Sequence, residues 1–254
     1  MGIIGENLTT SLINQINIRQ SKLGKVNLDH NDIIYNNSNT SWLRVASSVD
    51  VDDTQLAGLD DFTSAGAGNR FAKNAVLFGP AGNDENPLGR SGAFGFAEGN
   101  RLDKSNLYNY GWGANVNKWG YTPPPGVQNL SITALNRGAI RKANISLVAY
   151  NPDQFRIIEA LYLRLGFTIL VEWGHTMYYN SQGSLIQRQE FATPPFTTFM
   201  EGGTDTFKTV TEQLIEERER SNYNYDGFIG YISNFNWSFG NDGSYQITLN
   251  VITR

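Results

Sequence analysis

Few residues of this 254-residue chain have the types and spacing that chemistry requires. The two histidines are His30, in LDHNDII, and His175, in VEWGHTMYY. Asp29 and Asp32 lie beside His30, a combination that metal and acid–base sites use, but neither histidine has a partner at HExxH or comparable spacing. We therefore interpret His30 as a solvated loop histidine and His175 as a histidine at the turn that leads out of a strand.

A pair of carboxylates is the next candidate, because a glycosidase needs two of them across a sugar cleft. Glu172 and Asp226 fit best, since aromatic residues flank both. Glu172 alternates with apolar residues in a strand-like segment, and Asp226 opens a Tyr-Asp-Gly turn. Their spacing in sequence gives no distance between them, so the pair is weak evidence for catalysis.

Other catalytic motifs are missing from the sequence. The chain has no cysteine, which excludes thiol catalysis, thiolate metal sites and disulfides. It contains neither a GxSxG nucleophile elbow nor a GxxxxGK[ST] phosphate loop, and the glycine-rich GRSGAFGFAEG has no strand–helix context. We expect a protein that is not an enzyme, with no catalytic residues, no cofactor and no metal.

The composition also limits the classes of binding partner. The net charge is −4 and no run of Lys or Arg exceeds two residues, so we expect no nucleic-acid recognition and no anionic-membrane face. No apolar run approaches the ~20 residues of a membrane helix, and we expect no membrane insertion. The N-terminal MGIIGENLTTSL lacks the basic stretch and the apolar core of a secretory signal.

The second half of the chain has clear secondary-structure patterns. Alternation predicts strands over 127–136, 139–150 and 167–173 and a closing hairpin over 227–254, with apolar residues on both faces of 167–173, typical of a central strand. Asn151-Pro152 predicts the start of a helix that ends at Gly166, where we expect a positive φ, and a second helix covers about 205–221.

The first half is less regular. It contains a short helix over 6–20, a strand within 36–53 that bends near 46–48, and a short strand within 71–79. The rest of the stretch up to 125 has loop composition, which is typical of functional loops or of segments ordered by a partner.

These patterns predict a mainly β (α+β) fold. We expect antiparallel sheets or a tube-like barrel, two or three packed helices and long loops. Two regions are expected, a loop-rich 1–125 and a β-β-α-β-α-β-β unit over 126–254, which can also form one intertwined domain.

Apolar residues at helical spacing indicate which side chains face inward. In the helix over 6–20 these are Leu8, Leu12, Ile13 and Ile16. In the helix that begins at Pro152 they are Phe155, Ile158, Leu161, Tyr162 and Leu165. In the helix over about 205–221 they are Phe207, Val210, Leu214 and Ile215. The larger core residues are expected to be Trp42, Phe155, Leu161, Trp173 and Trp237. Aromatic residues within the loop-type sequence 108–121 are better explained by contact with a neighbouring subunit, and we expect interface anchors at Trp112, Trp119 and Tyr121.

Two stretches resemble structural proteins of tailed bacteriophages, of the baseplate or tail-hub kind. One runs from about Pro123 to Tyr179 and includes NRGAIRKA, QFRIIEALYLRLGFT and VEWG. The other, DGFIGYISNFNWSFGNDGSYQIT, is similar to the closing hairpin of those proteins, although Gln246 stands where they usually have Asp. SWLRVASSVDV and NAVLFG resemble their N-terminal region, and the intervening loops match nothing that we can name.

The resemblance implies a structural role in the virion. It suggests a tail component, assembled in the bacterial cytoplasm, that acts by association with other tail or baseplate proteins and with copies of itself. Hub proteins of this kind often contain tube-like barrels that pair sheets with neighbours. The alternative is a carbohydrate-binding or glycan-cleaving tail protein that contacts the host surface, which Trp112, Trp119 and the Glu172/Asp226 pair motivate.

Overall fold

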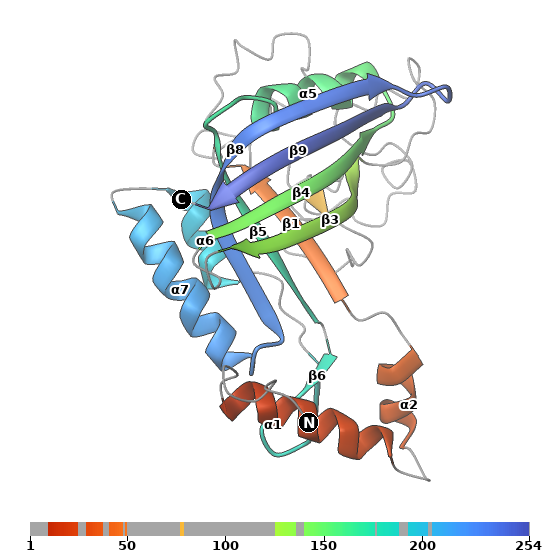
Figure 1. The fold of residues 1–254 in the computed structure, drawn as a ribbon, viewed down its shortest axis with the longest axis vertical. Coiled ribbons are helices and arrows are strands. Elements are labelled where there is room, and N and C mark those ends of the chain that lie inside the picture. The colour runs from red at the N-terminus through yellow and green to blue at the C-terminus, as the bar shows by residue number, and fades with distance from the viewer. Residues whose placement is uncertain are drawn as a thin grey trace, which may run out of the picture.

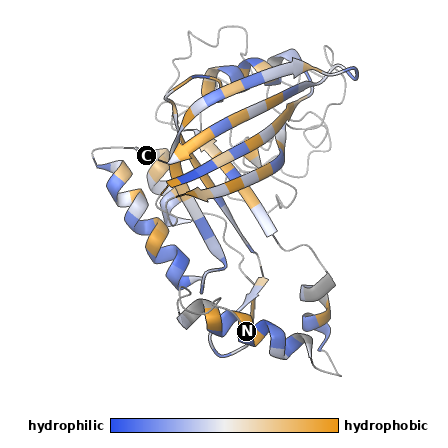
Figure 2. Ribbon diagram, in the orientation of Figure 1, coloured by the Kyte–Doolittle hydropathy of each residue, from blue (hydrophilic) through white to orange (hydrophobic). Residues whose placement is uncertain are grey.

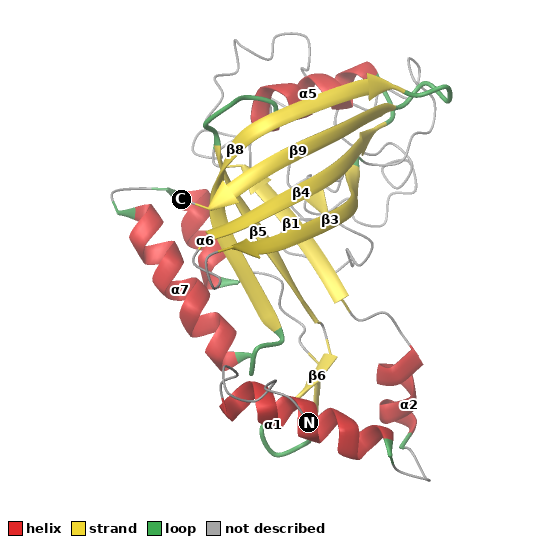
Figure 3. Ribbon diagram, in the orientation of Figure 1, coloured by secondary structure: helices red, strands yellow, loops and turns green. Residues whose placement is uncertain are grey.

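The computed structural model describes residues 10–24, 29–37, 41–47, 49, 77–78, 125–135, 140–175, 177–187, 193–202 and 205–253. The main feature of this part is a curled antiparallel sheet of seven strands (Figures 1 and 3). Their spatial order is β2 (Leu77–Phe78), β1 (Ser41–Ser47), β5 (Thr168–His175), β8 (Tyr225–Phe239), β9 (Tyr245–Thr253), β4 (Ile140–Ala149) and β3 (Gly126–Leu135). The mainly β, antiparallel fold that the sequence predicts is confirmed.

The sheet curls far enough to bring its two ends together. Strand β4 pairs with β9, and this pairing joins the β3–β4 hairpin to the β8–β9 hairpin. Strand β3 then lies in contact with β1 and β2, although it does not form a strand pair with either of them. Hydrophobic and hydrophilic residues alternate along β4 and β9 (Figure 2). Alternate side chains of a strand point to opposite faces, so the apolar set lines the inside of the curl.

Strand β5 is central, as expected. It pairs with β1 on one side and with β8 on the other, and Ile169, Leu170 and Val171 are all buried. Because β1 and β2 come from the first half of the chain and β5 and β8 from the second, the two halves contribute to one sheet.

Helix α5 (Pro152–Tyr162) begins where the Asn-Pro signal places it. The Asn151 side chain accepts a hydrogen bond from the backbone N–H of Gln154, and the Gln154 side chain accepts one from the N–H of Tyr150, one residue before the usual capping-box partner. The helix ends at Tyr162 rather than at Gly166, which has the expected positive φ of 81° in the turn to β5.

One side chain from each of the two predicted C-terminal helices is exposed although it was expected to face inward. Leu165 is 65% exposed because it lies beyond the end of α5, where helical periodicity no longer applies. In α7 (Thr206–Arg220), Val210 and Leu214 are buried four residues apart, and Ile215 lies ~100° further around the helix with 48% exposure.

The N-terminal helix α1 (Thr10–Leu23) is shifted toward the C-terminus from the predicted range and presents a different face. Ile16 is exposed, whereas Gln15 is buried and donates from Nε2 to the Tyr179 carbonyl oxygen at 2.7 Å. A tertiary hydrogen bond therefore positions this helix against β6 (Met177–Tyr179), the first strand of a small hairpin with β7 (Leu185–Gln187).

Three elements are additions to the sequence prediction. They are the β6–β7 hairpin, α2 (His30–Asn37), which occupies sequence interpreted as loop, and α6 (Pro194–Glu201). The start of helix α6 could have been predicted from the sequence. The Thr193 hydroxyl accepts a hydrogen bond from the Phe196 N–H as an N-cap, and two prolines occupy the first turn.

Candidate functional site

The two candidate carboxylates lie on neighbouring strands but on opposite faces of the sheet. In the β5–β8 ladder Glu172 is opposite Gly227, and Trp173 is opposite Asp226. Residues opposite each other share a face, so Glu172 and Asp226 point away from each other across the sheet. The structure does not bring them together across one cleft, as paired acid catalysis requires.

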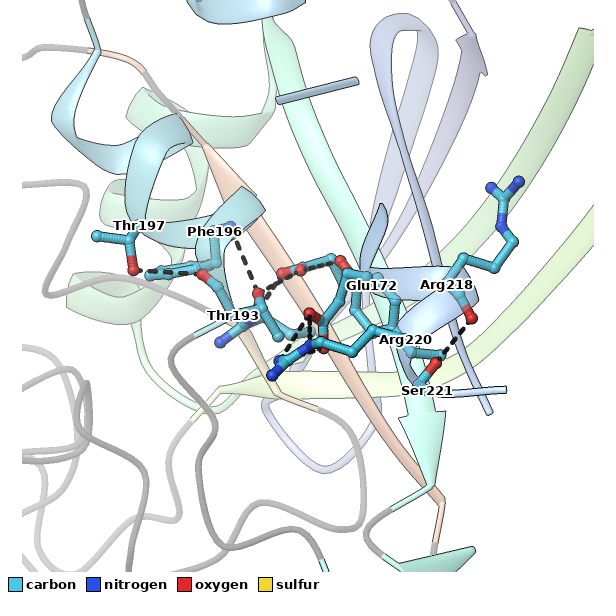
Figure 4. Close-up of polar contacts among 10 residues, drawn as sticks. Glu172, Thr193, Phe196, Thr197, Arg218, Arg220 and Ser221 are labelled. Atoms are coloured by element: carbon cyan, nitrogen blue, oxygen red, sulfur yellow. Dashed lines mark hydrogen bonds and ion pairs between the residues drawn. The ribbon is translucent and has the colours of Figure 1, made fainter. Parts of the chain in front are cut away.

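Glu172 is the centre of a buried polar network (Figure 4). The Arg44 guanidinium of β1 contacts Glu172 Oε2 through Nε at 2.8 Å and Nη2 at 2.6 Å. The hydroxyls of Thr193 and Tyr225 donate to Glu172 Oε1 at 2.7 and 2.5 Å. Both carboxylate oxygens are thus occupied by donors from three other parts of the chain, and no proton-accepting position is left exposed.

The same network joins α6 to the sheet. Arg44 Nη2 donates to Thr193 Oγ1 at 2.7 Å, and the Arg44 guanidinium lies 4.0 Å from the centre of the Phe196 ring. Burial and the Glu172 carboxylate raise the pKa of Tyr225, so its hydroxyl remains a proton donor. The arrangement fits a structural connection among β1, β5, β8 and α6 better than a catalytic centre.

Asp226, on the other face, is held by two arginines. Arg218 of α7 donates from Nε and Nη2 to Oδ1 at 2.9 and 2.5 Å, and Arg141 Nη1 of β4 lies 3.1 Å from Oδ2. Arg141 also donates to the Gly227 carbonyl oxygen at 3.2 Å. Because β9 pairs with β8 only from Gly230 onward, these arginines bind the part of β8 that lies beyond the end of β9.

The two histidines belong to separate elements, α2 and β5. His30 is the first residue of α2, and its backbone N–H donates to Asp29 Oδ1. Asp32 instead accepts a hydrogen bond from the Tyr179 hydroxyl at 2.6 Å. His175 ends β5, and burial followed by the nearby Arg19 charge lowers its pKa. Among the residues that the structure describes, no three His, Cys, Asp or Glu side chains gather as metal ligands.

An exposed aromatic cluster lies at the far end of the β8–β9 hairpin. Trp237 and Phe239 are 50% and 64% exposed. Tyr245 stacks on Phe155 of α5 with ring centres 4.4 Å apart, and Trp237 lies 4.9 Å from Phe155. The prediction that Trp237 is a core residue is therefore wrong, whereas Phe155 packs partly buried against the core as expected.

The exposure of this cluster has a clear structural cause. The last residue pair of the β5–β8 ladder is Thr168 and Tyr231. Next to it, the Gly166 N–H donates to the Ile232 carbonyl oxygen, and the Ile232 N–H donates to the Phe167 carbonyl oxygen. Beyond Ile232, the described part of the chain pairs β8 with β9 alone.

A groove of about 350 Å³ lies where β3 approaches β1. Aromatic and aliphatic side chains form most of its walls, and its polar lining carries hydroxyl and amide groups but no charge. The lining residues are Ser41, Trp42, Leu43, Gln128, Asn129, Leu130, Ile132 and Trp173. Trp42 is buried and Trp173 packs partly buried against the core, as the sequence predicts.

The predicted interface anchors Trp112, Trp119 and Tyr121 lie outside the described residues. Sequence reasoning missed both the groove and the exposed hairpin end. One feature of the sequence could have indicated the exposed hairpin end: SNFNWSF places three aromatic residues in an uncharged strand near the turn.

Comparison of the chain with protein-family models, with curated proteins and with solved structures finds no match. Within the described part of the chain, no helix is long and apolar enough to cross a membrane.

Proposed function

We propose that this chain is a non-enzymatic structural component of a phage tail baseplate or hub, which acts by assembly with neighbouring tail proteins and with copies of itself. The resemblance of the 123–179 and 226–254 segments to such proteins supports the tail assignment. The observation that carries the assembly role is the aromatic end of the β8–β9 hairpin, exposed beside a strand edge that β5 leaves uncovered.

The magnitude of that exposure supports a binding surface. Trp and Phe side chains bury roughly 150–250 Å² each. Covering the exposed parts of Trp237 and Phe239 thus removes on the order of 200 Å² from water, worth about 5 kcal/mol before the entropic costs of association. Aromatic residues with this much accessible area are typical interface anchors.

The buried polar network also favours a structural role. The best candidate acid, Glu172, is enclosed by Arg44, Thr193 and Tyr225, and Asp226 is paired with arginines on the opposite face. The glycan-cleaving alternative therefore loses the residue pair that motivated it. Carbohydrate binding through Trp112 and Trp119 stays a prediction, since both lie outside the described residues.

The test is the mass of the purified chain in solution, measured by light scattering over a concentration series. We expect mass to rise with concentration for the natural chain and to stay monomeric for Trp237→Ser/Phe239→Ser. The matched control is Ile215→Ser, which removes a similarly exposed apolar side chain from α7 and should assemble like the natural chain. Equal assembly by all three proteins, or a monomer at every concentration of the natural chain, contradicts the proposal.

A further inference from the structure

Two arginines beside the start of β8 keep N–H groups that no described residue accepts. Arg141 uses Nη1 for the Gly227 carbonyl oxygen and for Asp226 Oδ2. Arg218 uses Nε and Nη2 for Asp226 Oδ1. Within the described part of the chain, Nε and Nη2 of Arg141 and Nη1 of Arg218 are left without an acceptor. The two side chains are 21% and 25% exposed, so an acceptor from outside can reach them.

The charges in contact at Asp226 do not balance. Two guanidinium groups share one carboxylate, which leaves an excess of one positive charge. Glu216 and Glu219 of α7 are exposed, and neither forms a hydrogen bond or ion pair with Arg141 or Arg218 among the described contacts. Guanidinium groups with unused N–H donors are the usual receptors of carboxylates and phosphates.

The groove between β3 and β1 adjoins this arginine pair. The Arg141 guanidinium lies 6.0 Å from the centre of the Trp173 ring, and Trp173 lines the groove. Ile132, another groove residue, is opposite Ala143 in the β3–β4 ladder, and Ala143 is two residues from Arg141 on the same face. Arg141 is therefore a neighbour of the groove on two of its walls.

The groove combines apolar walls with neutral hydrogen-bonding groups. Gln128 and Asn129 are exposed at its rim, and each has an amide that can both donate and accept. Its volume of about 350 Å³ is within the range of roughly 300–1,000 Å³ that ligand sites have. The amides suit a peptide main chain better than the hydrocarbon of a fatty acid. The excess guanidinium charge favours an acidic ligand over a neutral glycan.

We infer that the arginine pair and the adjoining groove bind a segment of a partner protein that carries an Asp or Glu side chain next to apolar residues. The acidic side chain accepts from the unused N–H groups of Arg141 and Arg218, and the apolar side chains enter the groove. Gln128 and Asn129 pair with the main chain of the segment. The segment is held by side chains and not as an added strand, because β3 already lies in contact with β1 and β2.

This inference goes beyond the proposed self-association and does not rest on it. Asp226 is the second residue of β8, whereas Trp237 lies near the other end of this 15-residue strand, so the two surfaces are separate. We therefore expect Trp237→Ser/Phe239→Ser to bind the acidic segment like the natural chain, whether or not its self-association changes.

The first test finds the preferred segment without assuming its sequence. A displayed library of random heptapeptides is selected on the natural chain and, in parallel, on Arg141→Gln. We expect the natural chain to enrich peptides with Asp or Glu beside apolar residues, and Arg141→Gln not to enrich them. The inference is overturned if the natural chain enriches nothing, if the enriched peptides lack an acidic residue, or if both proteins enrich the same peptides.

The second test measures affinity from the fluorescence anisotropy of the most enriched peptide. We expect binding to be at least tenfold weaker for Arg141→Gln than for the natural chain. Lys142→Gln is the matched control, because it removes the same charge from the adjacent residue, which is exposed on the other face of β4. The control should bind within twofold of the natural chain, and equal weakening by both variants contradicts the inference.

Two comparisons separate binding from altered folding. Replacing the acidic residue of the peptide with its amide should weaken binding to the natural chain about tenfold, but binding to Arg141→Gln less than threefold, because the pair is already broken there. Asp226→Asn removes the internal carboxylate that competes for both arginines, so it should bind the acidic peptide more tightly. Loss of structure cannot produce such a gain. Equal effects of the amide on both proteins, or no gain in an Asp226→Asn chain with unchanged circular dichroism, count against the inference.

A last pair of variants tests the groove. Leu130→Glu places a negative charge in the groove, and Ser131→Glu places the same charge at the adjacent position on the other face. We expect binding at least tenfold weaker for Leu130→Glu and within threefold of the natural chain for Ser131→Glu. If only the arginine variants matter, the arginines bind an anion without the groove, and the inference is overturned. Displacement of the peptide by decanoate at a lower concentration than by unlabelled peptide also overturns it, in favour of a lipid carboxylate.

Discussion

The buried ion pair between Arg44 and Glu172 makes a quantitative prediction about stability. Both side chains are almost completely buried, and Glu172 accepts hydrogen bonds from Arg44, Thr193 and Tyr225. Glu172→Gln keeps the shape and one acceptor oxygen but removes the charge. Breaking a buried pair in this way leaves an uncompensated charge, and we expect a loss of about 3–5 kcal/mol in the free energy of unfolding.

A second variant separates the charge from the rest of the network. Arg44→Met/Glu172→Gln removes both charges, while the Gln oxygen still accepts from the Thr193 or Tyr225 hydroxyl. Replacing a buried pair with uncharged groups is often close to neutral, so we expect the double variant to be more stable than Glu172→Gln alone. It should lie within about 2 kcal/mol of the natural chain, because one hydroxyl is left without its acceptor.

The assay is equilibrium unfolding in urea, followed by tryptophan fluorescence and circular dichroism, under conditions where the chain is monomeric. The control pair is Lys208 and Glu212 on α7, which are 3.9 Å apart and largely exposed. Its Glu212→Gln variant should change stability by less than about 0.5 kcal/mol. The reasoning fails if Glu172→Gln costs no more than Glu212→Gln, or if the double variant is less stable than the single one.

Two further predictions concern the ends of β5. Gly166→Val should lower the free energy of unfolding by about 1–3 kcal/mol, because Gly166 has a φ of 81°, which a β-branched residue adopts only with strain. No atom lies within 4 Å of an added Cβ, so the expected cost comes from the backbone conformation and not from a steric clash. An unchanged melting temperature contradicts this prediction. His175 has a pKa below its ordinary value of 6.5 in the folded chain, so its stabilising contribution is present above pH 6.5 and is lost as the pH falls through the folded pKa. We therefore expect His175→Gln to reduce the fall in unfolding free energy below pH 6.5, and an identical pH profile for both proteins refutes it.

Local signals explain which parts of the fold the sequence predicts correctly. The hairpins follow from two-residue alternation, and the start of α5 follows from Asn151 and Pro152, because the cap and the first-turn proline act within a few residues. The inner face of α1 could not be predicted in this way. It depends on the hydrogen bond from Gln15 to Tyr179, which are 164 residues apart in sequence.

The misplacement of Trp237 has the same kind of cause. Alternation correctly puts Trp237 on the inner face, opposite the buried residue Ile247. It does not indicate where the neighbouring strand ends, and β5 stops pairing opposite Tyr231. The distal part of β8 therefore keeps the pattern of a core strand in a position where its aromatic side chains are accessible.

The register of the β5–β8 ladder decides which face of the sheet carries Glu172 and which carries Asp226. Side chains alternate with a period of two, so a shift of one residue in the β5–β8 ladder would place both carboxylates on the same face. The observed register instead gives Glu172 the buried donors of Arg44, Thr193 and Tyr225, and leaves Asp226 to the arginines on the other face. Because a one-residue shift in the β5–β8 ladder would turn the Tyr225 hydroxyl of β8 away from Glu172 of β5, the same network also stabilises the register. In this register Glu172 is enclosed by donors, whereas the aromatic end of β8, beyond Ile232, is exposed in the described part of the chain.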